Sequence, residues 1–306
     1  AIIDWSNFNL GSAATVQFVQ PNAQSVILNR VLDPNPTQVF GRINANGQVF
    51  LTNPYGVYFA PSASVDVGGL VATTYSISND DFMSGRYTFN RNGSTASVIN
   101  QGNLSASLGG YIALLAPEVQ NSGVVLARAG TVAFAAGDEV TLTIADGKSL
   151  SGITTTASAI ASLIENKLAV EAPDGQIILS AVAVNKLQAG VIKNSGSLQA
   201  TSMTAKGGKI VLEGDEIELT STATVDVSGR TGGGTVLMGG DWQGSGTMRQ
   251  ATKVTMAANS TINASATDNG DGGKVVLWSN VSDADSATMV AGSIYASAGP
   301  NGGNGG

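Results

Sequence analysis

Residues 47–61, GQVFLTNPYGVYFAP, contain two short apolar runs separated by the turn Asn53-Pro54-Tyr55-Gly56. Pro54 presets the backbone angle of a turn, Gly56 permits a positive φ, and the Asn53 side chain can bond to nearby backbone groups. Such a stretch forms either an isolated hairpin or one corner of a repeating coil. The rest of the chain decides between the two structures.

The first apolar run of this stretch recurs along the chain. Each copy has a glycine-containing pair, one variable residue and then a β-branched or aliphatic run. The copies lie at residues 46–51, 109–114, 174–179, 207–212, 233–238 and 272–277. Several copies are preceded by an Asn or Ser turn and a strand in which aliphatic and small polar residues alternate, at residues 98–107, 191–202 and 256–266. Alternation with period two is typical of a half-buried strand.

Recurring short strands with small residues at their corners predict a parallel β-helix. In this fold each coil stacks about 4.8 Å from the previous one, and aliphatic side chains line the interior. At roughly 20–25 residues per coil, the chain would form about a dozen coils and a rod about 60 Å long. The alternatives are a β-sandwich, which should show clearer two-residue hairpins, and a β-propeller, which should show a stricter period.

The composition excludes several classes of function. Charged residues make up only 12% of the 306 residues, the net charge is −7, and no Lys/Arg cluster occurs, so nucleic-acid binding is not predicted. Histidine and cysteine are both absent, which excludes Ser-His-Asp and Cys-His catalysis and histidine-ligated metals. We predict no cofactor. A chain without cysteine is also suited to crossing a membrane unfolded.

Three stretches depart from the repeating pattern. In residues 154–173, four aliphatic residues recur at helical spacing, namely Ile160, Leu163, Ile164 and Leu168. We therefore predict a helical decoration there and a second short helical piece at residues 183–189. Residues 78–94 are polar and aromatic with two turn signals, and are predicted to form an additional hairpin or loop.

Several short blocks follow one another in a specific order within the first third of the chain. They are Trp5 with Phe8 and Asn9, VILNRV at residues 26–31, the run from Gly41 to Val49, NPYGV at residues 53–57, and VGGLVA at residues 67–72. This order resembles the two-partner secretion domain at the head of filamentous-haemagglutinin-like exoproteins. Weaker similarity continues to about residue 205. The family motif reads Asn-Pro-Asn-Gly where this chain has Tyr55, and an earlier Asn-Pro-Asn-Leu motif is expected upstream of Ala1.

The resemblance implies a right-handed parallel β-helix with two parts. Residues 1–205 would be the secretion domain without its N-terminal cap, and residues 206–306 would continue the repeats up to a truncation. It also implies export from a Gram-negative bacterium, through the periplasm and a dedicated outer-membrane transporter whose periplasmic modules bind the extended chain. The leading functional expectation is the start of a secreted adhesin that acts in surface adhesion or biofilm.

The resemblance also supplies the candidate site. We predict that Asn53, Pro54, Tyr55 and Gly56 form a coil corner and are recognised by the transporter. The supporting family positions are Asn29, Arg30, Asn46, Gly47, Gly68 and Gly69.

Other functions remain as alternatives. A β-helical polysaccharide-degrading enzyme would need carboxylates in one groove, whereas the adjacent Asp80 and Asp81 would point to opposite faces of a strand. An enzyme is therefore not predicted. A haem-acquisition protein or a contact-dependent toxin would carry the same secretion domain. Expected partners besides the transporter are a host-surface or polysaccharide ligand and further copies stacked end to end. The acidic residues Glu213, Asp215, Glu216 and Glu218 are predicted to form an exposed ladder.

Overall fold

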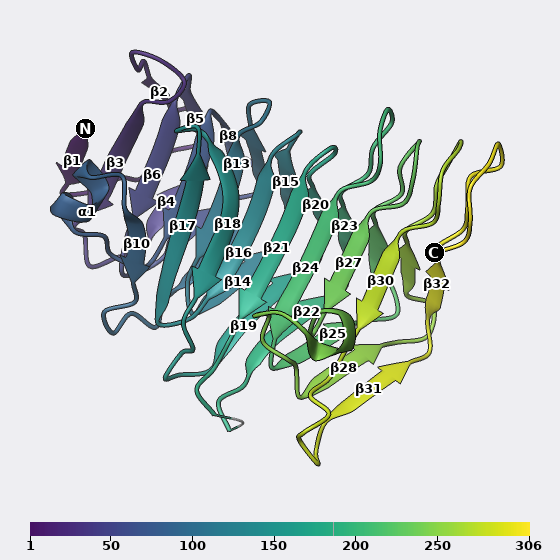
Figure 1. The fold of residues 1–306 in the computed structure, drawn as a ribbon. Coiled ribbons are helices and arrows are strands. Elements are labelled where there is room, and N and C mark those ends of the chain that lie inside the picture. The colour runs from purple at the N-terminus through teal and green to yellow at the C-terminus, as the bar shows by residue number, and fades with distance from the viewer. Residues whose placement is uncertain (186) are drawn as a thin grey trace.

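The computed structural model describes residues 1–185 and 187–306 and shows a rod wound from short strands (Figure 1). Most strands lie in three long sheets of ten, nine and ten strands, and neighbouring strands within each long sheet are parallel. Each turn of the chain adds one strand to each sheet. The chain is therefore a right-handed parallel β-helix, which confirms the predicted fold class.

The three sheets have the following members. The first sheet contains β1 (Ile2–Trp5), β3 (Val26–Val31), β6 (Gln48–Thr52), β9 (Gly69–Thr73), β13 (Tyr111–Leu115), β16 (Thr131–Ala136), β21 (Gln176–Ala181), β24 (Lys209–Gly214), β27 (Thr235–Met238) and β30 (Lys274–Leu277). The second contains β4 (Thr37–Val39), β7 (Val57–Phe59), β11 (Ser97–Asn100), β14 (Glu118–Asn121), β19 (Ser162–Asn166), β22 (Gly190–Asn194), β25 (Glu216–Leu219), β28 (Lys253–Met256) and β31 (Ala287–Val290). The third contains β2 (Thr15–Phe18), β5 (Arg42–Ala45), β8 (Ser64–Val67), β12 (Asn103–Ala106), β15 (Val124–Ala127), β20 (Ala169–Glu171), β23 (Ser197–Gln199), β26 (Thr224–Asp226), β29 (Thr261–Asn263) and β32 (Ser293–Tyr295).

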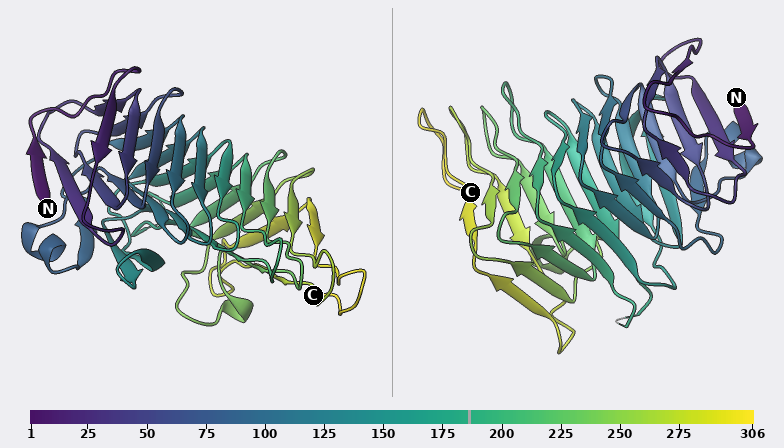
Figure 2. Two further views of the ribbon diagram at one scale, coloured as in Figure 1. Left: turned by 90° about the horizontal axis from the view of Figure 1, so that it is seen from above. Right: turned by 180° about the vertical axis from the view of Figure 1, so that it is seen from behind.

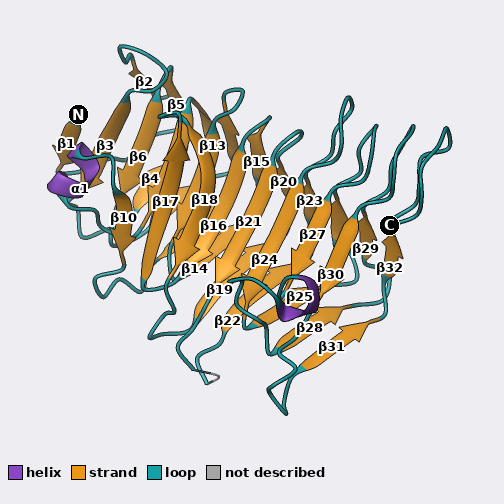
Figure 3. Ribbon diagram, in the orientation of Figure 1, coloured by secondary structure: helices purple, strands orange, loops and turns teal. Residues whose placement is uncertain are grey.

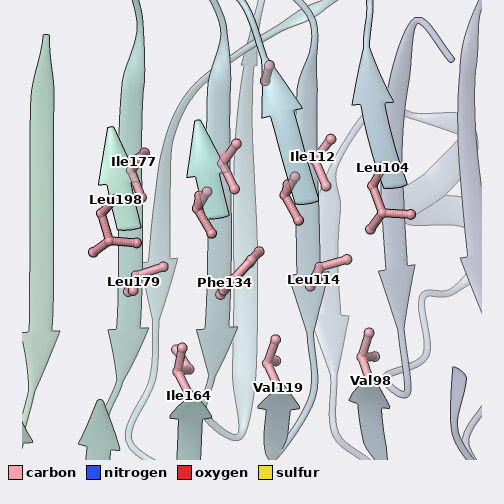
Figure 4. Close-up of a cluster of buried hydrophobic side chains, with 14 of the residues drawn as sticks. Val98, Leu104, Ile112, Leu114, Val119, Phe134, Ile164, Ile177, Leu179 and Leu198 are labelled. Carbon is pink, nitrogen blue, oxygen red and sulfur yellow. The ribbon is translucent and has the colours of Figure 1, made fainter. Parts of the chain in front are cut away.

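The glycine-led repeat maps onto one sheet. Its copies form β6, β13, β21, β24, β27 and β30, all in the first sheet. Inside the rod, Ile112, Val132 and Ile177 from successive coils lie in register and are fully buried. Figure 4 shows this interior, where Phe134 and Leu179 of the first sheet lie near inward side chains of the other two sheets. Burial of each large aliphatic side chain contributes about 1.5–3 kcal/mol.

A column of glycines runs along the rod where the chain enters the first sheet. A Cβ on Gly110 would overlap the carbonyl oxygen of Gly68, and one on Gly208 would overlap that of Gly175. The backbones of adjacent coils meet directly here, so no side chain fits. The same contact links Gly47, Gly68, Gly110, Gly130, Gly175, Gly208, Gly234, Gly273 and Gly306. The glycine of the repeat is thus required by packing between coils.

Coils differ in length because some carry insertions. Asn100 and Asn121 stack on each other 21 residues apart, whereas Asn121 and Asn166 stack 45 residues apart. Ten strands in the first sheet at about 4.8 Å spacing give a rod about 43 Å long. The predicted number of coils, a dozen, and the predicted rod length of about 60 Å were both too large. The prediction divided the whole chain into coils of equal length, whereas part of the chain forms insertions.

The largest insertions form a separate layer on the first sheet. It consists of the helix α1 (Asn79–Met83) and an antiparallel sheet of β10 (Tyr87–Asn90), β17 (Glu139–Ala145) and β18 (Ser149–Thr155). Its apolar side buries Phe50 and Val71 on the outer face of the rod. Residues 78–94 thus supply a helix and one strand of this layer, while β17 and β18 form its hairpin. Figure 2 shows α1, this hairpin and the later loop around the 3-10 helix η1 (Trp242–Gly244) on the same side of the rod.

Asp138 joins this layer to the rod. Its carboxylate accepts hydrogen bonds from Arg91 Nε at 2.6 Å and from the Ala159 amide at 3.1 Å. Burial alone would raise the pKa of Asp138, but these bonds, the Arg91 charge and a bond from Ser158 hold the pKa below its usual 3.8.

A depressed carboxyl pKa makes the layer sensitive to acid. The stabilisation that the Asp138 carboxylate gives to the folded protein is complete above the unfolded-state pKa of Asp138 and is lost as the pH falls through its lower folded-state pKa. We expect the urea midpoint to drop between about pH 6 and about pH 3, and Asp138→Asn to reduce that drop. Urea unfolding of both proteins at the two pH values measures this. An unchanged pH dependence in the variant would contradict the role of Asp138.

The helix predicted for residues 154–173 is wrong. The segment contains the end of β18 and then β19 and β20, and Ile164 points into the core in register with Val119 and Ile192. Pairing with coils on both sides overrides the helical spacing of the aliphatic residues. Within the described part of the chain, Figure 3 shows helix only at α1 and η1, and neither is long or apolar enough to cross a membrane.

The second predicted helix, at residues 183–189, includes Lys186, which lies outside the described residues. None of the described residues of this segment is helical: Ala183 forms a parallel β-bridge with Ser158, and the others form a bend and a turn. Asp80 and Asp81 lie in the first turn of α1 and not on a strand, and Asp81 pairs with Arg86 at 2.9 Å.

The acidic ladder is only partly exposed. Glu216 and Glu218 point outward as predicted, but Asp215 is buried and accepts hydrogen bonds from the amides of Ala183 and Gly190. Arg249 Nε lies 2.7 Å from the same carboxylate. Arg249 thereby holds the loop of residues 241–249 against the rod.

Arg249→Met should destabilise the protein, because it leaves the buried Asp215 carboxylate without its cation. We expect a loss of about 2 kcal/mol, below the value for a fully buried pair because Arg249 is partly exposed. Lys193→Met is the matched control, since Lys193 forms an exposed pair with Glu218 at 3.3 Å and should change little. Urea unfolding of both variants compares the two pairs, and equal losses would contradict this assignment.

Candidate functional site

The turn Asn53-Pro54-Tyr55-Gly56 joins β6 to β7 and forms a corner of the rod. The Gly56 amide donates to the Asn53 carbonyl at 3.0 Å, and the Tyr55 amide donates to Asn53 Oδ1 at 2.9 Å. The Asn53 side chain is fully buried and donates to the Asn35 carbonyl at 2.9 Å and to Thr37 Oγ1 at 3.0 Å. Asn53 therefore ties this corner to the coil before it.

Two further features fix the corner: a hydrogen bond from Ser94 and the backbone conformation of Gly56. Ser94 Oγ donates to the Pro54 carbonyl at 2.8 Å. Gly56 has φ = +126°, and a Cβ there would lie 3.3 Å from the Pro36 ring. Only glycine adopts this backbone conformation without strain. Pro54 and Tyr55 are exposed, so they are the two side chains of the turn that a partner of the folded protein could touch.

Asn29 and Arg30 lie close to this corner, on the neighbouring strand β3. They are in register with Leu51 and Thr52, the residues just before the turn. Asn29 is buried and accepts a hydrogen bond from Trp5 Nε1 at 3.0 Å. Arg30 donates to Asp4 at 3.1 Å and to Asn79 Oδ1 at 2.6 Å, which connects β1, β3 and the start of α1.

The other family positions lie at the opposite end of the same strands. Asn46 exchanges two 2.7 Å hydrogen bonds with the backbone of Gln20. Gly47 and Gly68 belong to the glycine column, and a Cβ on Gly69 would lie 2.8 Å from the Tyr111 ring. The predicted site residues therefore form two separate structural groups, and Asn53–Gly56 with Asn29 and Arg30 form one of them.

Sequence reasoning missed a ladder of buried asparagines. Asn100, Asn121, Asn166 and Asn194 are fully buried, and each side chain in turn donates to the Oδ1 of the next, at 2.8, 2.8 and 2.7 Å. The ladder ends where Leu219 lies in register with Asn194. The available signal was an Asn that closes an alternating strand, followed two residues later by glycine in three of the four cases. Across the described residues, no three Asp or Glu side chains gather as a metal site.

The corner at Asn53–Gly56, the glycine column and the parallel coils define a parallel β-helical domain. The chain belongs to the TPS secretion domain family, whose model matches residues 1–229. The crystal structure of the HMW1 secretion domain from Haemophilus influenzae is similar over 100% of this chain and 84% of that chain, with a TM-score of 0.78 and 30% identity.

Two curated relatives from Haemophilus influenzae are each named heme/hemopexin-binding protein. They are 31% identical over 230 residues and 30% identical over 287 residues. These alignments cover 73% and 86% of this chain but only 25% and 29% of the relatives. The chain thus spans little more than a quarter of the length of these relatives.

Proposed function

We propose that the chain is the secretion module of a longer two-partner exoprotein together with the first part of its β-helical shaft. The family match over residues 1–229 is the observation that supports this most directly. Residues 1–205 would act as the module, and residues 206–306 would continue the shaft. The partner is an outer-membrane transporter whose periplasmic modules bind the unfolded chain, and the destination is the surface of a Gram-negative cell or the medium.

The fold suits export without an energy source outside the cell. Each strand of the three long sheets pairs only with strands of the adjacent coils, so every folded coil exposes a complete template for the next. Coils that emerge from the transporter can therefore add one at a time. Burial of the inward aliphatic side chains makes each addition favourable and hinders return of the chain.

Co-expression with an outer-membrane transporter of the two-partner type from the same organism tests this proposal. The chain, preceded by a signal peptide, should accumulate in the medium when the transporter is present and in the periplasm when it is absent. A transporter that lacks its periplasmic modules should also fail to export it. Equal export with and without the transporter would overturn the proposal.

The activity of the longer exoprotein has two candidates. Binding of haem or hemopexin is favoured by the names of the two relatives. Adhesion to a host surface or polysaccharide, with a role in biofilm, is the rival. Pull-down of hemopexin by the complete exoprotein, with and without haem, supports the first candidate. A strain from which the exoprotein gene is deleted tests the second: loss of surface attachment with hemopexin binding unchanged supports adhesion.

A further inference from the structure

An apolar row follows the outer face of the first sheet along the rod. Leu28, Phe50, Val71, Ala113 and Ala133 form its first part, each in register with the next, and all are buried by the antiparallel layer. The row continues in register through Ile178, Val211 and Leu237. Beyond β18 the layer stops, and Ile178 and Val211 are only half-buried.

A groove lies where the layer stops. It has a volume of about 580 Å³ and is walled by residues 151–155 of β18 on one side and by residues 246–248 on the other. Ile178, Val211 and Leu237 form its apolar floor. We call it the β18 groove.

The wall formed by β18 is the open edge of a sheet. Among the described residues, β18 pairs with β17 on one side and with no strand on the other. Two backbone groups at the start of β18 are already bonded to the rod: the Leu150 carbonyl accepts from Thr131 Oγ1 at 2.6 Å and the Ser151 carbonyl accepts from Gln176 Nε2 at 3.1 Å. An unpaired strand edge is a template for another extended polypeptide.

We propose that the β18 groove binds one extended peptide segment of a partner protein, which adds a fourth strand to the β10–β17–β18 sheet. Its backbone would pair with β18, and its alternate apolar side chains would rest on Ile178 and Val211. The added strand would extend the packing that β17 and β18 already make on the same apolar row.

The opposite wall of the groove favours a single strand over a second copy of the chain. Pairing of β18 with its counterpart in another molecule would bring that molecule's β17 one strand spacing further, about 4.8 Å. The loop of residues 241–249, which Arg249 fixes to Asp215, forms the opposite wall of the groove and lies on the side where that strand would have to fit.

The charges at the two ends of the floor give the peptide a direction. Lys209 and Glu213 flank Val211 on the outer face of β24, at its start and its end. β18 runs the same way as the first sheet, because Thr131 Oγ1 and Gln176 Nε2 at strand starts bond to the carbonyls of Leu150 and Ser151 (Figure 1). A peptide antiparallel to β18 would place its N-terminus near Glu213 and its C-terminus near Lys209. A basic N-terminal residue is therefore preferred beside Glu213, whereas the Asp241 carboxylate, which also lines the groove, offsets part of the Lys209 charge at the other end.

A labelled peptide that copies the side-chain pattern of β17 tests the proposal. The probe is KVTLTIE, which keeps the alternation of Val140, Leu142 and Ile144 and carries Lys and Glu at its ends. We expect saturable binding to the complete 306-residue chain by fluorescence anisotropy. Hydrogen exchange of the β18 amides should slow in the complex.

Matched variants locate the binding. Val211→Lys places a charge on the floor and should weaken binding at least about tenfold. Val191→Lys changes a half-buried, outward valine of β22 on another sheet and should leave binding within about twofold. Thermal unfolding verifies that both variants remain folded. Unchanged binding by Val211→Lys, or no saturable binding at all, overturns the proposal.

Modified probes separate strand addition from other binding. An added strand pairs with β18 through every second amide of the peptide. We therefore compare two methylated probes, one N-methylated at Val, Leu and Ile and the other at the two Thr. Methylation in one probe should abolish binding, and methylation in the other should not. Reversal of the two end charges should weaken binding. Equal binding by both methylated probes overturns the proposal. A neutral glucan oligosaccharide that quenches Trp242 fluorescence and displaces the probe identifies a sugar site and also overturns it.

Discussion

Gly56→Val should abolish export of the protein and prevent the first coils from folding. Valine at φ = +126° is strained by about 1–3 kcal/mol, and its Cβ would press on Pro36 of the preceding coil. The strain acts at a corner where Asn53 and Gly56 both bond to residues 35–37. Since later coils need this one as a template, an early fault should stop all of them. Secretion is measured as the fraction of the chain in the medium when the transporter is co-expressed.

Tyr55→Asn is the control for this experiment. It restores the residue usual at this position of the motif. The Tyr55 side chain is exposed, and only the backbone amide of Tyr55 takes part in the hydrogen bonds of the corner. Export of this variant should match that of the unchanged protein. Normal secretion of Gly56→Val would refute the prediction. Refolding of purified Gly56→Val shows whether the defect is in coil formation or in recognition by the transporter.

Asn121→Leu should destabilise the rod by about 3–5 kcal/mol, the second large effect. Asn121 Oδ1 accepts from Asn100, and its Nδ2 donates to Asn166, so the change removes both ladder bonds inside the buried core. The Gly123 amide also loses its acceptor at 3.3 Å. Each buried polar group left without a partner costs about 1–3 kcal/mol. The urea midpoint and hydrogen exchange of β14 and its neighbours measure the loss.

Asn194→Leu is the matched control for Asn121→Leu. Asn194 ends the ladder, and Leu219 already lies in register on its far side. Asn166 keeps a second acceptor, the Ser197 carbonyl at 3.3 Å, when Asn194 is changed. Asn194 also gives up its bond to the Gly196 carbonyl at 3.1 Å, but that carbonyl keeps the Thr224 amide, so we expect a loss of about 1–2 kcal/mol. Equal losses at the two positions would contradict the idea that the ladder acts as a connected unit.

Local rules made the main architecture predictable from the sequence. The glycine at the start of each repeat is needed where coils touch, and the alternation after it follows from one face pointing inward. Both signals lie within six residues, for example at 46–51 and 207–212. The corner at Asn53–Gly56 was likewise predictable, because Pro54 and Gly56 have conformational preferences of their own.

The features that the sequence did not reveal share one physical cause. Each depends on which coils lie next to each other, and that is not visible in a local stretch of sequence. Short strands separated by turns put Leu163, Ile164 and Leu168 at a spacing that also fits a helix. The asparagine ladder joins residues separated by 21, 45 and 28 positions, so no fixed period reveals it. Asp215 is held by the amides of Ala183 and Gly190 and by Arg249, all of them distant in the sequence.

The glycine column restricts how such a protein can change in evolution. Replacement of a column glycine, or a one-residue shift of the strand that it begins, puts a side chain where only hydrogen fits, and the coil cannot pack on its neighbour. A deletion or duplication of one whole turn keeps glycine above glycine. We therefore expect shafts of different lengths among relatives to arise by gain and loss of complete turns, with irregular growth confined to loops away from the column.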